Sequence, residues 1–279
     1  IIMALDQATS VGNDATEPVL KQLADWAGDV SPDWPELALE RAAHAFGDTV
    51  ACMIAGADDA RPANVRRGVS AWGSGPSSVA GQTEKLPAPW AAMANGTAAH
   101  ALDYDDNVQV VLGHTSAVQV PALLALGEAI GASGQQLVDA YIVGFEIQMA
   151  LGRGVNWSHY NIGWHSTSTI IGIGTAGACA RLLGLDRLGM AHALSLGTSM
   201  ACGPKAQFGS MAKSFHAGLS AQHAVTSAQL AAAGLEGRME VLEAPMGFLE
   251  LFGGNFPPGW EKSLEGFGEE LAILEHGIV

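Results

Sequence analysis

Apolar residues recur along most of the chain at the spacing of helices. In residues 17–29, Val19, Leu20, Leu23 and Trp26 fall on one face of a helix. Later apolar segments have the lengths of helices and are bounded by glycine. We therefore predict helices over residues 17–29, 31–56, 86–106, 117–131, 133–154, 166–185, 186–201 and 214–235.

Residues that favour helix ends and turns interrupt this pattern. Ser31 or Asp33 can cap the second helix, and Gly56 can end it. Ser133 can cap the helix that follows it. Residues 70–85 are rich in glycine and serine, which predicts a loop or a short strand. The pattern as a whole predicts an all-α fold.

The composition is typical of a protein whose helices pack closely. Of the 279 residues, 48% are hydrophobic, 15% are charged and 35 are glycine. The 13 basic and 28 acidic residues give a net charge of −15, which argues against binding to nucleic acid or to an anionic membrane surface. An acidic small molecule would bind only where the few Lys, Arg and His side chains converge, so the position of each cation is informative.

Cysteine usage and hydropathy indicate the cellular compartment. Cys52, Cys179 and Cys202 are far apart and form no CxxC pair. This argues against a disulfide framework, a structural zinc site and a cysteine-held iron–sulfur cluster, and we expect buried free thiols. No apolar run has the length of a transmembrane helix, and the first residues lack the features of a signal peptide. These features predict a cytoplasmic protein.

Gly172, Gly174 and Gly177 have the spacing of a dinucleotide-binding fingerprint. Such a fingerprint follows a strand, and an acidic residue for the ribose hydroxyls comes about 20 residues later. Residues 190–198 contain no carboxylate, Asp186 comes too early, and helix-length segments lie on both sides. We therefore interpret these glycines as a small-residue face that lets two helices approach closely. A nicotinamide-dependent oxidoreductase remains the alternative.

Three polar segments interrupt otherwise apolar helices, at residues 98–116, 163–169 and 207–218. Each contains histidine, the first contains three aspartates, and the last contains Lys213. Imidazoles beside a carboxylate supply acids and bases near neutral pH, and a lysine supplies a positive charge for a carboxylate substrate. The helix dipole disfavours aspartates at the C-terminal end of a helix, so we expect the three aspartates of the first segment to have another role. Together the segments predict an acid–base site.

Other chemistries compete with this interpretation. Asp103, Asp106 and His114 could hold a metal ion, although the chain has no compact ligand motif such as HExxH. The chain contains no GxSxG motif, which argues against a serine hydrolase. Lys205 and His216 flank Lys213 in the sequence and are alternative substrate contacts. For Lys205, a structural role at the surface competes with substrate contact.

Five motifs, in this order, resemble the MmgE/PrpD family, which includes 2-methylcitrate dehydratase, cis-aconitate decarboxylase and an iminodisuccinate epimerase. The motifs are NGTAAHALDYDD, GHTS, GWHSTST, MAKSFHAG and EAPMGFLELFGG. The resemblance implies a large all-helical domain, a smaller α/β lid domain, a homodimer, and an active site in the cleft between the domains. Family members are longer than this chain, so most of the lid is expected to be missing. The implied division is a flexible arm at residues 1–16, the helical domain at 17–265, and the start of the lid at 266–279.

The resemblance also implies which residues form the site. Decarboxylase members of the family tend to carry threonine where this chain has Asn107 and proline where it has Thr115, which favours another activity of the family. The implied substrate-binding residues are Asn107, Lys213 and His216. The implied catalytic residues are Asp103, His114, His165 and Lys213.

The implied function is that of a cofactor-independent lyase that acts on a small di- or tricarboxylate, as 2-methylcitrate dehydratase does. Lys213, aided by His114, would bind carboxylates, and His165 or Asp103 would move a proton next to one of them. Loss of hydroxide gives dehydration, loss of carbon dioxide gives decarboxylation, and reprotonation on the other face gives epimerisation. An alternative of another class is an inactive helical module that serves only in oligomerisation.

Overall fold

The computed structural model describes residues 17–254 and 259–276 and is predominantly helical, which confirms the all-α fold class. The flexible arm predicted for residues 1–16 lies outside the described residues. Two short strands, β1 (Ser77–Ser78) and β2 (Lys85–Leu86), pair antiparallel in the segment predicted as a loop or short strand. The α-helices are α1 (Val19–Asp29), α2 (Glu36–Gly56), α3 (Ala60–Val69), α4 (Ala88–Ala99), α5 (Thr115–Ile130), α6 (Gly134–Val155), α7 (Ser158–Asn161), α8 (Ile170–Leu182), α9 (Arg187–Ser199), α10 (Met211–Ala232), α11 (Phe248–Phe252), α12 (Trp260–Ser263) and α13 (Ala272–Glu275), and the 3₁₀ helices are η1 (Ser70–Trp72), η2 (Ser166–Ser168) and η3 (Lys205–Gln207).

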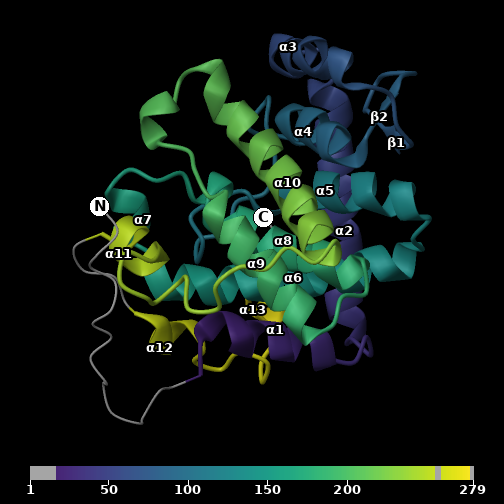
Figure 1. Cartoon of the computed structure of the whole chain (residues 1–279). Helices are drawn as coiled ribbons and strands as arrows, with labels where there is room; N and C mark the ends of the chain where they lie inside the picture. The colour runs from purple at the N-terminus through teal and green to yellow at the C-terminus, as the bar shows by residue number, and fades with distance from the viewer. Residues whose placement is uncertain (1–16, 255–258, 277–279) are drawn as a thin grey trace.

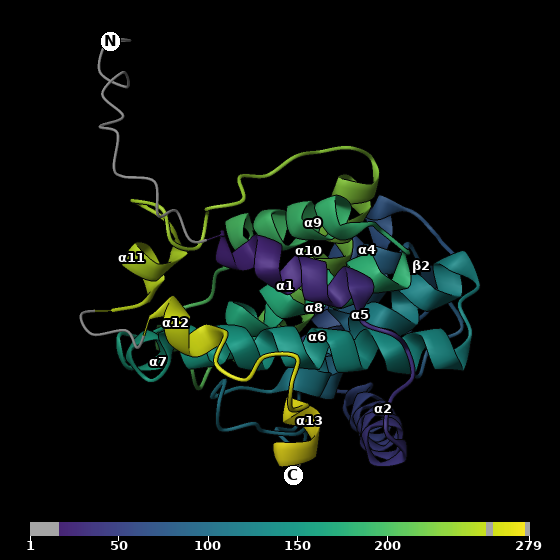
Figure 2. The ribbon, with the colours of Figure 1, turned by 90° about the horizontal axis from the view of Figure 1, so that it is seen from below.

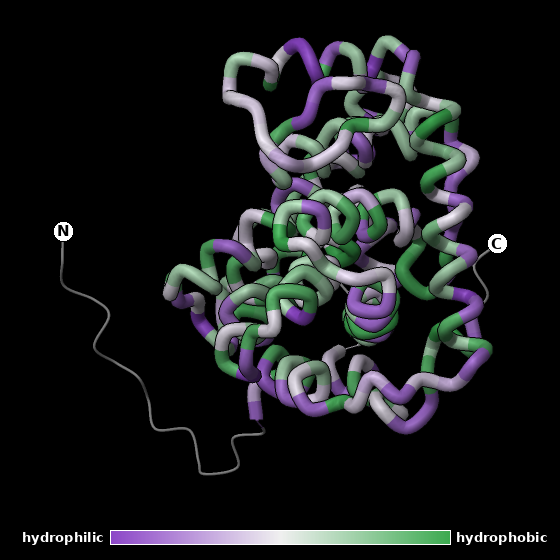
Figure 3. The backbone as a smooth tube through the Cα atoms, turned by 90° about the vertical axis from the view of Figure 1, so that its right-hand side faces the viewer, coloured by the Kyte–Doolittle hydropathy of each residue, from purple (hydrophilic) through white to green (hydrophobic). Residues whose placement is uncertain are grey.

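The helices pack in layers around α6 and α8 (Figures 1 and 2). In Figure 2, α1 and α9 lie on one side of this pair, and α2 and α13 lie on the other. Helix α10 crosses α4, α5, α8 and α9, and its contact with α4 is extensive. Figure 3 shows apolar stretches in green where the helices meet, and many polar stretches on outer turns. None of the helices in the described ranges combines the length and hydrophobicity needed to cross a bilayer.

Helix starts follow the predicted capping chemistry in α6 but not in α2. The Ser133 hydroxyl accepts a hydrogen bond from the Gln136 N–H, and the Gln136 side chain accepts one from the Ser133 N–H. This capping box confirms the predicted start of α6. Helix α2 begins after Pro35, without a side-chain cap, so the caps predicted at Ser31 and Asp33 are wrong. The fixed φ of Pro35 places the chain in an extended conformation at the point of entry.

Two further elements differ from the prediction. Helix α3 lies where the sequence pattern predicts no helix, because only Pro62 and Val69 of its residues are buried and the apolar periodicity is weak. Its cap is Asp59, whose carboxylate accepts a hydrogen bond from the Arg61 N–H. Helix α4 ends at Ala99, seven residues before the predicted end at residue 106. The residues that follow turn into a loop that carries the aspartates.

The three cysteines are free, as the sequence predicts. Cys52 and Cys179 are buried, and Cys202 is half-buried. Burial raises the pKa of the Cys52 thiol to about 11 and also raises that of Cys202. All three are therefore protonated, poorly nucleophilic thiols near neutral pH.

The glycines with fingerprint spacing lie on α8 and are packing positions. A Cβ on Gly172 would lie 2.4 Å from Ser220 Oγ on α10. A Cβ on Gly174 would lie 2.4 Å from Gln148 Cγ on α6. A Cβ on Gly177 would lie 2.7 Å from Ile147 Cδ1 on α6 and 3.0 Å from Leu194 Cδ2 on α9. The helix follows η2 rather than a strand, so the predicted packing role is confirmed.

Helices α4 and α10 cross at very close range. A Cβ built on Gly96 would lie 2.9 Å from the Cα of Gly218. A Cβ on Gly218 would lie 2.1 Å from the Met93 carbonyl oxygen and 2.2 Å from Thr97 Oγ1. Only glycine at both positions permits this approach, and it brings the last residues of α4 beside the first turns of α10.

The C-terminal segment packs against the helical body through a buried carboxylate. Glu146 of α6 accepts hydrogen bonds from the first two N–H groups of α13, at 2.8 and 3.0 Å. The Phe267 ring lies 4.7 Å from the ring of Trp26, measured between centroids. Burial raises the pKa of Glu146 to about 7, against the opposing effect of these hydrogen bonds. The domain boundary predicted at residue 266 stays a prediction.

We expect Gly218→Ala to destabilise the protein because the new methyl group meets backbone of α4 that cannot move aside. The expected loss in the free energy of unfolding is about 1 to 3 kcal/mol or more. Gly47→Ala is the matched control, since a Cβ on Gly47 in α2 meets nothing within 4 Å. It should be neutral or stabilising by up to about 1 kcal/mol. Urea denaturation of both variants checks this, and equal stabilities would contradict the packing argument.

Glu146 predicts a pH dependence of stability. Its pKa in the folded state, about 7, lies above the ordinary value of 4.5, so the folded protein binds this proton more tightly than the unfolded chain. The stabilisation is full below pH 4.5 and is lost as the pH rises through 7, with a range on the order of 2 to 3 kcal/mol. Thermal melts from pH 5 to pH 8 should show Glu146→Gln gaining on the wild type as the pH rises. A constant difference between the two proteins would rule out a titrating Glu146.

Candidate functional site

Three segments that are far apart in the sequence meet beside the crossing of α4 and α10. The first runs from the end of α4 through the following loop to the start of α5. The second is the turn that leads into η2, and the third is the first two turns of α10. Helix α10 contacts both α4 and η2. We call their polar residues the polar cluster: His100, Asp103, Asp105, His114, His165, Lys213 and His216.

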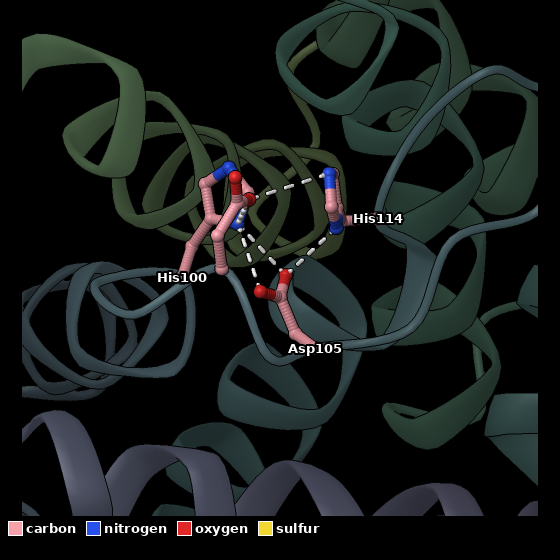
Figure 4. A group of neighbouring side chains, drawn as sticks. His100, Asp105 and His114 are labelled. Carbon is pink, nitrogen blue, oxygen red and sulfur yellow. Dashed lines mark hydrogen bonds and ion pairs between the residues drawn. The ribbon is translucent and has the colours of Figure 1, made fainter. Parts of the chain in front are cut away.

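Asp105 is the buried centre of the polar cluster, and the rings of His100 and His114 both point toward it (Figure 4). Asp105 Oδ2 lies 2.8 Å from His100 Nδ1, which donates a hydrogen bond. The same oxygen lies 3.1 Å from His114 Nδ1, a close charge contact that falls outside ideal hydrogen-bond geometry. The centroids of the two rings are 4.3 Å apart. The side chains of Asp105 and His100 have no exposed surface.

Burial and Asp105 act in opposite directions on these two imidazoles. Burial lowers the pKa of His100 and outweighs the effect of its hydrogen bond to Asp105. Burial also lowers the pKa of His114, but its contact with Asp105 reverses this and leaves the pKa above its ordinary value. Burial raises the pKa of Asp105, but the two histidines outweigh it and hold the pKa far below its usual range. Compared with a free imidazole, His114 is therefore more readily protonated and His100 less readily.

Lys213 and Asp103 form an ion pair at the open side of the polar cluster. Lys213 Nζ lies 2.5 Å from Asp103 Oδ1, and that oxygen lies 3.8 Å from His114 Nε2. Asp103 adopts a left-handed backbone conformation, with φ of 59°, which its ion pair helps to hold. Burial raises the pKa of Asp103, but Lys213 outweighs it and lowers the pKa. The Asp103 side chain is 57% exposed, so a molecule from solvent can reach this pair.

His165 and His216 form a neutral pair at the other side of the polar cluster. Their Nδ1 atoms are 3.2 Å apart, so one ring donates a hydrogen bond and the other accepts it. The edge of the Phe208 ring packs against His165, with centroids 4.8 Å apart. Among the described residues, no carboxylate forms an ion pair with either histidine. Burial lowers the pKa of both, and that of His165 falls far below 6.5, so His165 is an uncharged imidazole and a weak base near neutral pH.

Asp106 serves the structure next to this site. Its carboxylate accepts hydrogen bonds from Thr115 Oγ1 at 2.6 Å, and from the backbone N–H and the hydroxyl of Ser116 at 3.0 and 2.6 Å. The Ser116 hydroxyl in turn lies 2.8 Å from the Tyr141 hydroxyl. Burial raises the pKa of Asp106, and these hydrogen bonds oppose the rise. The carboxylate thus satisfies the first turn of α5, which also begins with His114 as its N-cap residue.

Four donor groups of the polar cluster come close enough to surround a cation, since their donor atoms lie within 4.8 Å of one another. They already pair with each other and with the Lys213 ammonium group, so protein cations balance both aspartates. The metal site considered from the sequence also needs Asp106, whose oxygens are occupied at the start of α5. The geometry therefore favours an ion-pair network over a metal centre. The four groups are His100, Asp103, Asp105 and His114.

A pocket of about 280 Å³ lies nearby, between α3, α4 and α10. It shares no residue with the polar cluster, and none of the residues that line it titrates near neutral pH. We therefore assign acid–base chemistry to the polar cluster and not to this pocket. The lining residues are Arg61, Asn64, Val65, Thr97, Met211, Ala212 and Phe215.

Comparison with known proteins agrees with the motifs that surround this cluster. Residues 21–261 match the MmgE/PrpD N-terminal domain. The chain belongs to the MmgE/PrpD family. This confirms the resemblance inferred from the five sequence motifs.

Three relatives of this MmgE/PrpD chain carry related names. It is 34% identical to cis-aconitate decarboxylase of Homo sapiens over 191 residues, which are 65% of this chain and 39% of that protein. The Mus musculus cis-aconitate decarboxylase is 33% identical over 189 residues, with 65% of this chain and 38% of that protein covered. The cis-aconitate decarboxylase-like protein oryM of Aspergillus oryzae is 28% identical over 262 residues, with 90% and 53% covered. The chain thus spans about two fifths to one half of the length of these relatives.

The structure gathers the residues that the sequence assigned to the MmgE/PrpD site, with one exception. The four predicted catalytic residues and His216 all belong to the polar cluster. Asn107, predicted to bind substrate, is exposed in the loop that follows Asp106, and among the described residues its side chain forms no hydrogen bond with the cluster. Lys205 donates a hydrogen bond to the Tyr160 carbonyl and lies over the Tyr160 ring, which supports its structural role. The catalytic roles stay predictions.

Two central residues of the polar cluster, His100 and Asp105, were not selected from the sequence. Asp105 was visible only as one of three unexplained aspartates, and His100 lies five residues before it at the end of an apolar helix. A histidine that ends an alanine-rich helix ahead of an acidic loop is the signal that could have indicated the pair.

We expect Asp106→Ala to destabilise the protein, because it leaves two hydroxyls and one N–H of the first turn of α5 without their buried acceptor. The expected loss is about 2 to 4 kcal/mol. Asp58→Ala is the control, since Asp58 is exposed in a turn and should change stability by less than about 0.5 kcal/mol. Chemical denaturation measures both variants. Similar small effects would mean that Asp106 does not hold the start of α5.

Proposed function

We propose that this chain is the helical part of a lyase that acts on a small di- or tricarboxylate. The observation that carries the proposal is the open ion pair of Lys213 and Asp103, which lies beside His114, the histidine that favours the charged form. The names of the relatives support the same class of substrate. On the family resemblance, we also propose a homodimer in the cytoplasm.

Substrate binding would start at Lys213. This lysine is one of only 13 basic residues in an acidic chain, and its ammonium group already binds a carboxylate, that of Asp103. A carboxylate of the substrate can take the same position, since the Asp103 side chain is 57% exposed and can move aside. His114 adds a second positive charge beside it. Two neighbouring cations suit a molecule that carries more than one carboxylate.

Proton transfer would use the contrast between His114 and His165. The charged form of His114 can deliver a proton to carbon and its neutral form can take one up, whereas the lowered pKa of His165 makes that ring a weak base suited to accepting a hydrogen bond. Negative charge that develops next to a substrate carboxylate would be stabilised by Lys213 and His114, which are already in place. Every step of this scheme uses side chains of the chain itself, so we propose that no cofactor takes part.

The relatives' names favour decarboxylation of cis-aconitate over the dehydration suggested by Asn107 and Thr115. In decarboxylation, the bond between carbon and a leaving carboxylate breaks, carbon dioxide departs, and the electron pair left behind is protonated by an acid. An imidazolium such as His114 can supply that proton. Dehydration and epimerisation would instead begin with proton removal by a base, and the lowered pKa of His165 makes it a weak one. We therefore rank cis-aconitate first and 2-methylcitrate second as substrates.

Proton NMR of reaction mixtures tests this proposal. The protein is incubated separately with cis-aconitate, 2-methylcitrate, citrate and an epimerisable dicarboxylate, and binding of each is followed by thermal shift. A new product identifies the reaction, and saturable binding without product supports a substrate-binding helical part that needs further residues for turnover. If no polycarboxylate reacts or binds, the proposed function is wrong.

Lys213→Met should weaken polycarboxylate binding by about tenfold to a hundredfold, because one charge-assisted hydrogen bond to the ligand is lost. Lys205→Met is the matched control. Lys205 lies outside the polar cluster, so this variant should bind like the wild type. Isothermal titration with the best ligand from the NMR experiment measures both. Equal affinity of the Lys213 variant and the wild type would remove Lys213 from the binding site.

A further inference from the structure

We propose that Asp105 is a positioning residue that holds a proton on Nδ1 of His114, so that Nε2 is the nitrogen that exchanges protons with substrate. His100 supports this role by holding the Asp105 carboxylate from its other side. The proposal deepens the proposed function and depends on it only for the identity of the molecule, the substrate, that exchanges a proton with Nε2. The arrangement of Asp105 and the two histidines is a property of the chain alone.

The two nitrogens of His114 have different surroundings. Nδ1 lies 3.1 Å from Asp105 Oδ2, in the buried part of the polar cluster. Nε2 lies 3.8 Å from Asp103 Oδ1, on the side where Asp103 is exposed. A carboxylate accepts hydrogen bonds and cannot donate them, so Asp105 favours the form of His114 with its proton on Nδ1. Nε2 then faces the open side, where a ligand can approach.

Backbone contacts hold His114 in place beside Asp105. His114 is the N-cap residue of α5, and its N–H donates a hydrogen bond to Thr167 Oγ1 at 3.1 Å. The following turn of α5 is tied to Asp106. Because the backbone is held on both sides, the side chain of His114 stays next to Asp105. Only 13% of the His114 side chain is exposed, which limits competition from water.

His100 completes the arrangement from α4. Its Nδ1 donates to both oxygens of Asp105, at 2.8 and 3.1 Å. Since its proton lies on Nδ1, the neutral ring has a lone pair on Nε2, and that buried atom has no hydrogen-bond partner among the described residues. An unsatisfied buried nitrogen destabilises the fold. The position of His100 is therefore better explained by its hydrogen bonds to Asp105 than by a contribution of its own to stability.

Several charged or titratable groups face His114, and their effects can be told apart. Asp105 and Asp103 lie in the loop after α4, and Asp106 lies behind the start of α5. His100 approaches from α4, and Lys213 approaches from α10. His165, from the turn before η2, is neutral. Asp105 is the only carboxylate within hydrogen-bond distance of a His114 ring nitrogen in the described part of the chain, so its removal should affect His114 most.

Nitrogen-15 NMR of the histidine side chains tests the proposal without substrate. The peaks of His114 are assigned by comparison with His114→Gln. In the wild type, the pKa of His114 should lie above 6.5. At pH values above this pKa, the neutral ring should carry its proton on Nδ1. In Asp105→Asn, the amide can donate to Nδ1, so the pKa should fall by at least about one unit and the proton should move to Nε2.

Asp106→Asn is the matched control, because it neutralises the adjacent carboxylate, which touches α5 and not the His114 ring. It should lower thermal stability and leave the His114 tautomer unchanged. The proposal is overturned if wild-type His114 carries its proton on Nε2, a result that needs no variant to fold. It is also overturned if Asp105→Asn leaves the tautomer and pKa as in the wild type, or if Asp106→Asn changes them equally.

Kinetics adds a second readout with the best substrate from the NMR screen. Asp105→Asn should lower kcat by at least about 100-fold, leave KM nearly unchanged, and shift the pH profile toward lower pH with the His114 pKa. A rise in KM alone, with an unshifted profile, would contradict a positioning role. If no polycarboxylate reacts with the wild type, the proposed function fails, while the tautomer experiment still decides the role of Asp105.

Discussion

The contact between α4 and α10 is the constraint on which the candidate site depends. Gly96 and Gly218 bring the two backbones so close that a methyl group at either position would overlap the other helix. His100 ends α4 one turn after Gly96, and His216 precedes Gly218 by two residues on α10. The distances between the side chains that α4 and α10 contribute to the polar cluster depend on this crossing. A wider crossing would leave Lys213 unable to reach Asp103, and the loop after α4 would lose the ion pair that holds its left-handed residue.

The charges of the site are arranged by depth. Asp105 and His100 are fully buried, His114 is slightly exposed, and Lys213 and Asp103 are open to solvent. Burial destabilises every charged form, so the Asp105 carboxylate stays ionised only because two imidazoles face it. The outer pair is more exposed than Asp105 and His100, so it can exchange partners with a ligand. The inner contacts can therefore hold the geometry while the outer ones bind and release.

The sequence predicts the helical framework well because apolar runs and glycines carry that information locally. It predicts α3 poorly, since few of its residues are buried, and it misplaces the start of α2, where Pro35 replaces a side-chain cap. The family motifs predict residues that meet in the candidate site but do not assign the roles of neighbouring aspartates. Asp103 pairs with Lys213, Asp105 with two histidines, and Asp106 with the start of α5. These roles depend on the path of one loop, which no local pattern encodes.

The ion pair of Lys213 and Asp103 also couples binding to proton transfer under the proposed function. In the ligand-free chain, Lys213 lowers the pKa of Asp103 and so makes it a weak base. A substrate carboxylate that takes the place of Asp103 on Lys213 removes this effect. The pKa of Asp103 then rises, because its main cationic partner is engaged, and Asp103 becomes a stronger base. The net charge of −15 gives an anionic substrate no long-range attraction, so this local exchange of partners, rather than the overall field, would have to supply the affinity.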